Sequence, residues 1–273
     1  MTKSMTSDID RAAAYGDGVF ETIAIRGGQA RYWNAHLERL QTACLRLGLQ
    51  CPSPDKLAAL LTSELNGNSG VTEFATARLV VSAAPGPRGY RRKANAGTAA
   101  SCHIYASQPV DQRLVRDGVE VRMCTLRLAI QPALAGMKTL NRLEQILARA
   151  EWDEADVFEG LTLDTDGRLI CGTMSNVFIV SESRLCTPGI TRCGVAGIMR
   201  ARVMQRLRDA GVTCNVRDIA VDELRAASEI FLTNSQFGVL PVRRIDELEF
   251  EVGAITRQVQ TLMAADGVPE SMA

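Results

Sequence analysis

Short strand-like runs alternate with amphipathic helical segments along most of the chain, and this alternation limits the possible folds more than any other sequence feature. Residues 19–33 contain two strand-like runs on either side of Gly27-Gly28, which predicts a hairpin. A helix is predicted to follow from about Asn34 and to end at Gly48. Its apolar residues recur at helical spacing: Leu37, Leu40, Cys44 and Leu47.

The rest of the chain continues the alternation and predicts an α/β fold of two lobes. Residues 108–118 are expected to connect a small N-terminal lobe, 1–107, to a larger lobe, 119–273. Helix 142–153 has an apolar stripe, and Asn141 with Glu144 resembles a capping box at its start. Other helices are expected at 55–65, 198–210 and 253–265, and other strands at 74–82, 101–107, 119–124, 156–163, 168–171 and 176–181.

Composition excludes several classes of protein. With 273 residues, 46% hydrophobic and 23% charged, the chain has the mix of an ordinary globular protein. The 31 basic and 31 acidic residues cancel, which argues against a nucleic-acid binder that relies on a broad basic field. Eight scattered cysteines without a C-x-x-C pair, and two distant histidines, disfavour a metal site. No apolar run is long enough for a membrane span, so we expect a cytoplasmic protein.

Lys138 is the first candidate for chemistry, because only four lysines are present. It lies in the run PALAGMKTLNRLEQ, directly before a predicted helix start. Apolar neighbours and a positive helix end both disfavour the ammonium form, so the amine becomes a better nucleophile. Position alone favours an ordinary surface lysine in a loop.

Three further features suggest binding of an anion. The run RCGVAGIM, 192–199, opens a predicted helix, and the first N–H groups of a helix bind anions. The turn Thr233-Asn234-Ser235 offers N–H and hydroxyl donors after a strand. Arg39 on the first predicted helix has a guanidinium that suits a phosphate. Each has an ordinary alternative, which is a plain helix start, a plain turn or a solvated arginine.

The order of these pieces resembles one known family. YGDGVFET (15–22), HLERL (36–40), KTLNRLEQ around Lys138, SNVF (175–178) and GVAGIMR (194–200) are similar to the class IV aminotransferase-like family of pyridoxal phosphate enzymes. The resemblance covers about residues 10 to 245. It implies the fold type IV architecture, in which a small N-terminal α/β lobe and a larger C-terminal α/β lobe enclose pyridoxal 5′-phosphate in a cleft.

The resemblance also assigns residues. Lys138 matches the lysine that binds the cofactor covalently, and Arg39 matches the arginine that binds its phosphate. Ile198 and Met199 match positions whose backbone N–H groups bind the phosphate, and Ser235 falls near a further phosphate contact. Tyr15 is expected to line the substrate pocket, and Arg88 and Tyr90 are expected to meet substrate carboxylates. An exposed basic loop explains Arg88 and Tyr90 equally well.

Two departures from the family pattern stand out. The short strand that usually precedes the YGDG run is not recognisable in MTKSMTSDIDRAAA. Cys171 occupies the position, five residues before Asn176, where the family has the glutamate that pairs with the cofactor's pyridine nitrogen. A thiol is a poor charge partner, so the ring becomes a weaker electron sink, which elimination tolerates better than transamination. Alternatively, Cys171 is a core residue at a strand end.

Within the family, KTLNRLEQILARAE and GVAGIMR are most similar to the lyases that convert 4-amino-4-deoxychorismate to 4-aminobenzoate and pyruvate for folate synthesis. The resemblance also implies a homodimer that binds a small-molecule substrate. It implies no binding to nucleic acid or to a membrane. One alternative is an aminotransferase of D-amino or branched-chain amino acids. Another is a non-catalytic protein that keeps the fold and the cofactor.

Overall fold

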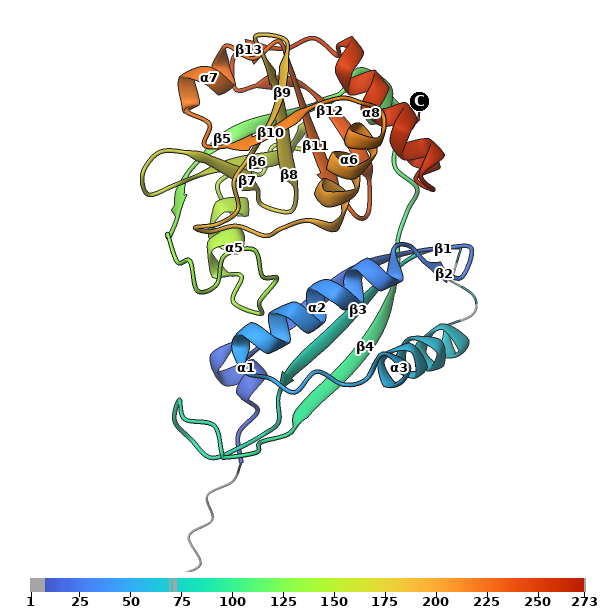
Figure 1. Cartoon of the computed structure of the whole chain (residues 1–273), viewed down its shortest axis with the longest axis vertical. Helices are drawn as coiled ribbons and strands as arrows, with labels where there is room; N and C mark the ends of the chain where they lie inside the picture. The colour runs from blue at the N-terminus through green and yellow to red at the C-terminus, as the bar shows by residue number, and fades with distance from the viewer. Residues whose placement is uncertain (1–7, 69, 71–72, 273) are drawn as a thin grey trace, which may run out of the picture. The chain divides into compact units, whose positions relative to one another are not determined.

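The computed structural model describes residues 8–68, 70 and 73–272 and divides the chain into two compact units (Figure 1). The first unit comprises the described residues up to Gln108 together with Met137–Asn141. The second comprises Pro109–Gly136 and the chain from Arg142 onward. Lys138 therefore belongs to the first unit, although the residues on both sides of its short segment belong to the second.

The first unit is a four-stranded antiparallel sheet with the strand order β2-β1-β3-β4. The predicted hairpin is confirmed, because β1 and β2 pair on either side of Gly27-Gly28. Its elements are α1 (Arg11–Tyr15), β1 (Gly18–Arg26), β2 (Gln29–Ala30), α2 (Trp33–Leu47), α3 (Pro54–Gly67), β3 (Phe74–Ala83) and β4 (Thr98–Ala106).

One face of this sheet is covered by α2 and α3 (Figure 1). Side chains alternate between the faces of a strand, so Val19, Glu21 and Ile23 of β1 lie on the same face. Val19 and Ile23 pack in the core with Leu37 and Leu40 of α2. The strand period thus places a carboxylate, Glu21, on the side of β1 that faces the core. The predicted helix stop is confirmed, since the residue after α2 is a glycine in the left-handed conformation.

The second unit is built on a nine-stranded sheet in the order β10-β9-β8-β11-β12-β5-β6-β7, with β13 paired to β12. Its helices are α4 (Gln112–Asp117), α5 (Leu143–Arg149), α6 (Ile198–Asp209), α7 (Val221–Arg225) and α8 (Ala254–Ala265), followed by a 3₁₀ turn, Pro269–Ser271. Its strands are β5 (Val119–Leu128), β6 (Val157–Asp164), β7 (Leu169–Gly172), β8 (Asn176–Ser181), β9 (Arg184–Pro188), β10 (Cys214–Arg217), β11 (Glu229–Asn234), β12 (Gly238–Ile245) and β13 (Leu248–Glu249).

The larger sheet curls, since β7 at one end of the strand order also contacts β8 and β9. Its central strands carry nearly continuous apolar runs, and Phe178 of β8 stacks on Phe231 of β11 with ring centroids 4.8 Å apart. Helices α6 and α8 pack on each other and on β11 (Figure 1). Two curled sheets with these helices form the fold type IV architecture that the sequence predicted.

The predicted capping box at Asn141 and Glu144 is wrong. Arg142 occupies the N-cap of α5 without a side-chain hydrogen bond. Asn141 Nδ2 donates to the Gly16 carbonyl at 3.1 Å, and Glu144 Oε1 accepts from Ala129 N at 2.7 Å. Both side chains therefore bind backbone groups that are distant in sequence, and neither caps α5.

The apolar stripe of α5 is largely exposed within the single chain. Leu143, Ile146 and Leu147 keep 73%, 61% and 60% of their surface accessible, so this face of the helix is not part of the chain's own core. Among the helices that the structure describes, none combines the length and the apolar character needed to cross a bilayer.

Candidate active site

Lys138 is held by the first strand of the small sheet. The segment around it pairs with β1 through an antiparallel bridge between Val19 and Thr139. The Lys138 carbonyl accepts from Phe20 N at 2.9 Å, and Leu140 N donates to the Gly18 carbonyl at 3.0 Å. The ammonium nitrogen lies 4.3 Å from the centroid of the Phe20 ring, a cation–π contact. Both backbone and side chain are therefore fixed by β1, which is not the environment of a loop lysine.

Arg39 projects from α2 onto the buried carboxylate of Glu21. Its Nε donates to Glu21 Oε1 at 2.8 Å, and Nη2 pairs with Oε2. His36 Nδ1 donates to the same Oε2 at 2.6 Å, and His36 and Glu21 side chains are 1% and 2% exposed. Arg39 is accordingly not a solvated helix charge: two of its three guanidinium nitrogens are oriented by one carboxylate.

Glu21 stays ionised although it is buried. Burial acts to raise its pKa, but the positive charge of Arg39 and the hydrogen bonds from His36 and Arg39 outweigh this effect, and the pKa is lowered from 4.5. The second histidine nitrogen, Nε2, is buried and has no hydrogen-bond partner among the described residues. Neither Glu21 nor His36 was singled out from sequence, although both lie in runs, VFET and HLERL, that carry the family resemblance.

The N-terminus of α6 in the second unit is open to an anion. Gly197 at the N-cap has an extended backbone and provides no side-chain cap, and the first turn contains no acidic residue. The N–H groups of Ile198 and Met199 have no intrahelical acceptor at this position of a helix. Both side chains are buried, so an anion bound at this helix end would contact only their backbone groups.

The loop before α6 is shaped by Asn176, the asparagine of SNVF. Asn176 Nδ2 donates to the Val195 carbonyl at 2.9 Å, and Gly136 pairs with Val195 in a parallel bridge. Gly194 has a φ of +82°, where a side chain is strained. A Cβ at Gly197 would lie 2.0 Å from Asn176 Oδ1. The glycines of GVAG are therefore required by packing against Asn176 and by the turn.

Ser235 lies in the turn between β11 and β12. Asn234 Oδ1 accepts from Gln236 N and Phe237 N at 2.8 and 3.0 Å, which fixes the backbone of this turn. The neighbouring Thr233 Oγ1 is buried and has no hydrogen-bond partner in the described part of the chain. The turn thus offers a half-buried hydroxyl on an ordered backbone.

Cys171 is a buried, neutral thiol on β7. It pairs with Thr162 of β6, whose Oγ1 lies 3.8 Å from its Sγ, and packs with Leu128, Ile170 and Cys193. Burial raises the pKa of Cys171 to about 12, so the thiol carries no charge at neutral pH. Cys171 is thus a core residue, and it lies one residue before the end of β7.

A buried glutamate that sequence reasoning missed supports the segment between Cys171 and Asn176. Glu159 accepts hydrogen bonds from Thr173 Oγ1 at 2.6 Å, Ser175 Oγ at 2.8 Å and Met174 N at 3.0 Å. Nothing in the sequence of its strand, β6, distinguishes Glu159 from other polar strand residues, so only the folded chain reveals this role.

The structure brings the three expected substrate residues into one region of the first unit. Tyr15 ends α1, and its ring centroid lies 5.4 Å from that of Tyr90. Tyr90 is 88% exposed and Arg88 is exposed. Arg88 and Tyr90 are therefore accessible in this chain, whereas Tyr15 is half-buried.

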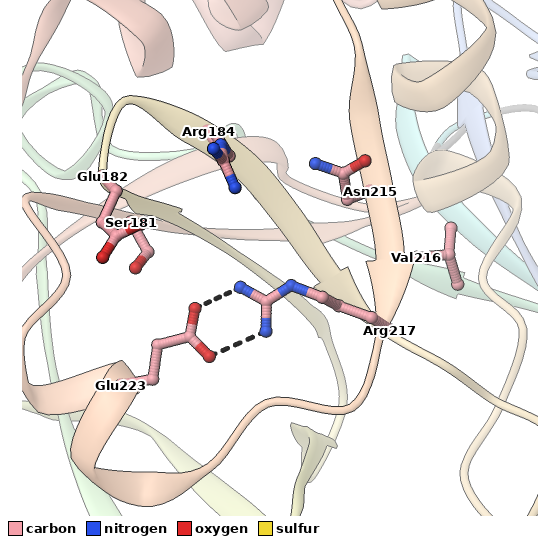
Figure 2. Close-up of a pocket in the computed structure, with 7 residues that line it drawn as sticks. All are labelled: Ser181, Glu182, Arg184, Asn215, Val216, Arg217 and Glu223. Carbon is pink, nitrogen blue, oxygen red and sulfur yellow. Dashed lines mark hydrogen bonds and ion pairs between the residues drawn. The ribbon is translucent and has the colours of Figure 1, made fainter.

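A polar cavity of about 470 Å³ lies elsewhere, beside β9 and β10 (Figure 2). Arg217 and Glu223 point toward each other there and form an ion pair. None of the predicted site residues lines it, and we assign no role to it.

Each unit carries groups of the kind that pyridoxal 5′-phosphate requires. In the first unit, Lys138 offers an amine for the aldehyde and Arg39 offers a guanidinium for the phosphate. In the second unit, the N-terminus of α6 and the Ser235 hydroxyl offer hydrogen-bond donors for the phosphate.

Comparison with known proteins agrees with this chemistry. The model of the family "Amino-transferase class IV" matches residues 18–245. Aminodeoxychorismate lyase of Vibrio harveyi is 36% identical over 92% of this chain and 93% of its own length. The crystal structure of 4-amino-4-deoxychorismate lyase from Pseudomonas aeruginosa is similar with a TM-score of 0.87 and 41% identity, covering 98% of this chain and 96% of that one. D-alanine aminotransferase of Bacillus licheniformis is 28% identical over 93% of this chain and 89% of its own.

Proposed function

Because the chain belongs to the class IV aminotransferase family, whose members depend on pyridoxal 5′-phosphate, we propose that it is a lyase that converts 4-amino-4-deoxychorismate to 4-aminobenzoate and pyruvate. The observation that carries this proposal is the similarity to two lyases of that name over nearly the whole of each chain. An aminotransferase is the second candidate, favoured by the similarity to a D-alanine aminotransferase.

Four groups of this chain would hold the cofactor. The Lys138 amine would bind its aldehyde, and Arg39, oriented by Glu21, would bind its phosphate. The N–H groups of Ile198 and Met199 would donate to the phosphate from the start of α6, with Ser235 as a further donor. When bound, pyridoxal 5′-phosphate supplies a conjugated ring that accepts the electron pair released at the substrate carbon next to the amino nitrogen.

Lys138 would also act as the acid and base of the reaction. With substrate bound, the free Lys138 amine would take the proton from the substrate ring carbon next to the nitrogen. The same group then protonates the enolpyruvate as it leaves, and the substrate ring becomes aromatic. Contact with Phe20 holds the amine in place for both transfers.

Cys171 supports elimination over amino transfer. The resemblance places this side chain at the pyridine nitrogen, where the family has a carboxylate. A neutral thiol with a pKa of about 12 cannot hold a proton on that nitrogen by charge. Amino transfer depends strongly on a protonated ring, whereas an elimination whose leaving group carries the electron pair away depends on it less.

The proposed substrate carries two carboxylates, so its recognition requires cations and hydrogen-bond donors. Arg88 and the hydroxyls of Tyr15 and Tyr90 are the groups we assign to its carboxylates. Arg88 and Tyr90, separated by Gly89, are both exposed, and Tyr15 contacts Tyr90. A charge-assisted pair between a guanidinium and a carboxylate is the strongest such contact.

The protein is further proposed to be a cytoplasmic homodimer. The exposed apolar face of α5, formed by Leu143, Ile146 and Leu147, supports a partner subunit. All eight cysteines are free thiols, as expected in a reducing compartment. Sedimentation at micromolar concentration is expected to give a dimer, and a monomer would contradict this proposal.

The decisive experiment is incubation of the loaded protein with 4-amino-4-deoxychorismate. We expect 4-aminobenzoate and pyruvate in equal amounts. Transfer of the amino group to 2-oxo acids, without pyruvate release, would identify an aminotransferase instead. A protein that is yellow with bound cofactor, but that neither releases 4-aminobenzoate nor transfers the amino group, would be a non-catalytic member of the family.

A further inference from the structure

The loop that carries Arg88 and Tyr90 is tied to the rest of the first unit through one carboxylate. Asp17, in the YGDG run, accepts from Arg11 Nε at 2.8 Å and from Arg92 Nε at 3.0 Å. The pKa of Asp17 is lowered, mainly by the hydrogen bond from Arg92. Arg11 is only 3% exposed, so this arrangement is not a surface ion pair.

Arg11 extends the network to the loop backbone. Its Nη1 donates to the Gly89 carbonyl at 2.9 Å and its Nη2 to the Tyr90 carbonyl at 3.0 Å. Gly89 N in turn donates to the Tyr15 hydroxyl at 2.9 Å, and the Arg11 guanidinium lies 5.0 Å from the centroid of the Tyr15 ring. Three backbone groups of two successive residues are therefore fixed by side chains of α1.

Arg92 anchors the other side of the segment. Its Nη1 donates to the Leu47 carbonyl at 2.6 Å, at the C-terminal end of α2, while Nε and Nη2 remain on Asp17. The result is a loop whose backbone is held at both ends while the side chains of Arg88 and Tyr90 point outward, exposed.

We propose that Asp17 and Arg11 are positioning residues that hold the 88–92 loop in its binding conformation, so that Arg88 and Tyr90 meet the carboxylates of an anionic substrate without a prior ordering step. This inference rests on the proposed function, because it takes Arg88 and Tyr90 to be substrate-binding. Asp17 and Arg11 act through the loop backbone and do not touch the substrate.

The physical basis is preorganisation. A loop that is mobile before binding loses backbone entropy when the substrate orders it, and this loss weakens binding. Ordering one residue costs about a factor of ten in affinity, so release of Gly89 and Tyr90 is expected to raise KM roughly 10- to 100-fold. Because the reacting groups are elsewhere, kcat is expected to fall much less than KM rises.

The test uses the loaded enzyme with Asp17→Asn, which removes the charge that holds both arginines. We expect the rise in KM together with faster trypsin cleavage at Arg88, Arg91, Arg92 or Lys93, while the absorption spectrum of the bound cofactor is unchanged. The matched control is Asp8→Asn, which breaks the exposed ion pair between Asp8 and Lys93, the residue directly after the loop, and should change neither KM nor cleavage.

Two further variants keep the test decisive. Arg11→Lys retains the charge beside Asp17, but a single ammonium cannot also reach both carbonyls, so it should reproduce the change in KM and cleavage even if Asp17→Asn fails to fold. Arg88→Ala tests the proposed function separately. An unchanged KM in this variant would show that Arg88 does not bind the substrate. Unchanged cleavage and KM in Arg11→Lys, with Arg88→Ala impaired, would overturn the positioning role alone.

Discussion

Replacement of Glu21 by Gln is predicted to be among the most destabilising single changes in the first unit. The side chain keeps its size but loses the charge that compensates Arg39. Glu21 and Arg39 side chains are 2% and 14% exposed, so the guanidinium remains largely buried beside a neutral amide. Removal of one partner of a buried ion pair costs about 3–5 kcal/mol, because the other charge stays desolvated.

Equilibrium urea unfolding at pH 7, with the same cofactor concentration for each variant, measures this cost. Glu38→Gln is the matched control, because Glu38 lies on α2 next to Arg39 and the substitution makes the same change in charge at an exposed position. It should alter the free energy of unfolding by no more than about 0.5 kcal/mol. A loss below about 1 kcal/mol for Glu21→Gln would refute the reasoning.

The pH dependence provides a second check. The pKa of Glu21 is lowered in the folded chain, so its contribution to stability is complete above its unfolded value near 4.5 and is lost as the pH falls through the folded value. The difference in unfolding free energy between the wild type and Glu21→Gln should therefore narrow below about pH 4.5. A difference that stays constant between pH 7 and pH 4 would mean that the charge of Glu21 is not the cause.

Lys138→Ala should keep the fold, because its backbone hydrogen bonds to β1 remain, while elimination drops by at least ~10²–10⁴-fold; borohydride reduction and peptide mapping of the wild type should find the cofactor on Lys138 and not on Lys56 or Lys93. Cys171→Glu should restore a charge partner for the ring nitrogen, and therefore shift the cofactor spectrum and raise amino transfer to 2-oxo acids; an unchanged spectrum with unchanged partitioning would count against this role. Gly197→Ala should displace Asn176 from the loop before α6 and destabilise the second unit by about 1–3 kcal/mol. Its affinity for pyridoxal 5′-phosphate should fall more than its affinity for pyridoxal, measured by titration of the apoprotein.

Local patterns along the chain were sufficient for most of the longer helices and strands, but not for the short helices α1 and α4. Helix α2 and its end at Gly48 follow from the spacing of Leu37, Leu40 and Cys44, because a 3.6-residue period and a left-handed glycine are properties of neighbouring residues. The start of α6 was predicted for the same reason. The family runs added Lys138, for which position alone favoured an ordinary surface lysine.

The tertiary structure decided which side chains those elements bring together. Asn141 and Glu144 resembled a helix cap in sequence, yet their side chains bind the backbone of Gly16 and Ala129. The sequence could not predict this, because a hydrogen bond to a distant carbonyl or amide leaves no local signal. The same holds for Glu159, which supports a turn from another strand.

What the sequence determined alone was the order of the longer helices and strands and the chemical groups available, because both depend on residues within a few positions of each other. What only the folded chain decided was that Glu21 orients Arg39 and that Asp17 joins Arg11 to Arg92. Arg11 and the Gly89 carbonyl it binds are 78 residues apart, and such contacts depend on the register of β1 and β3 and on the path of the loop. No local periodicity specifies them, so the environment of each reactive group emerges only when distant strands and helices pack.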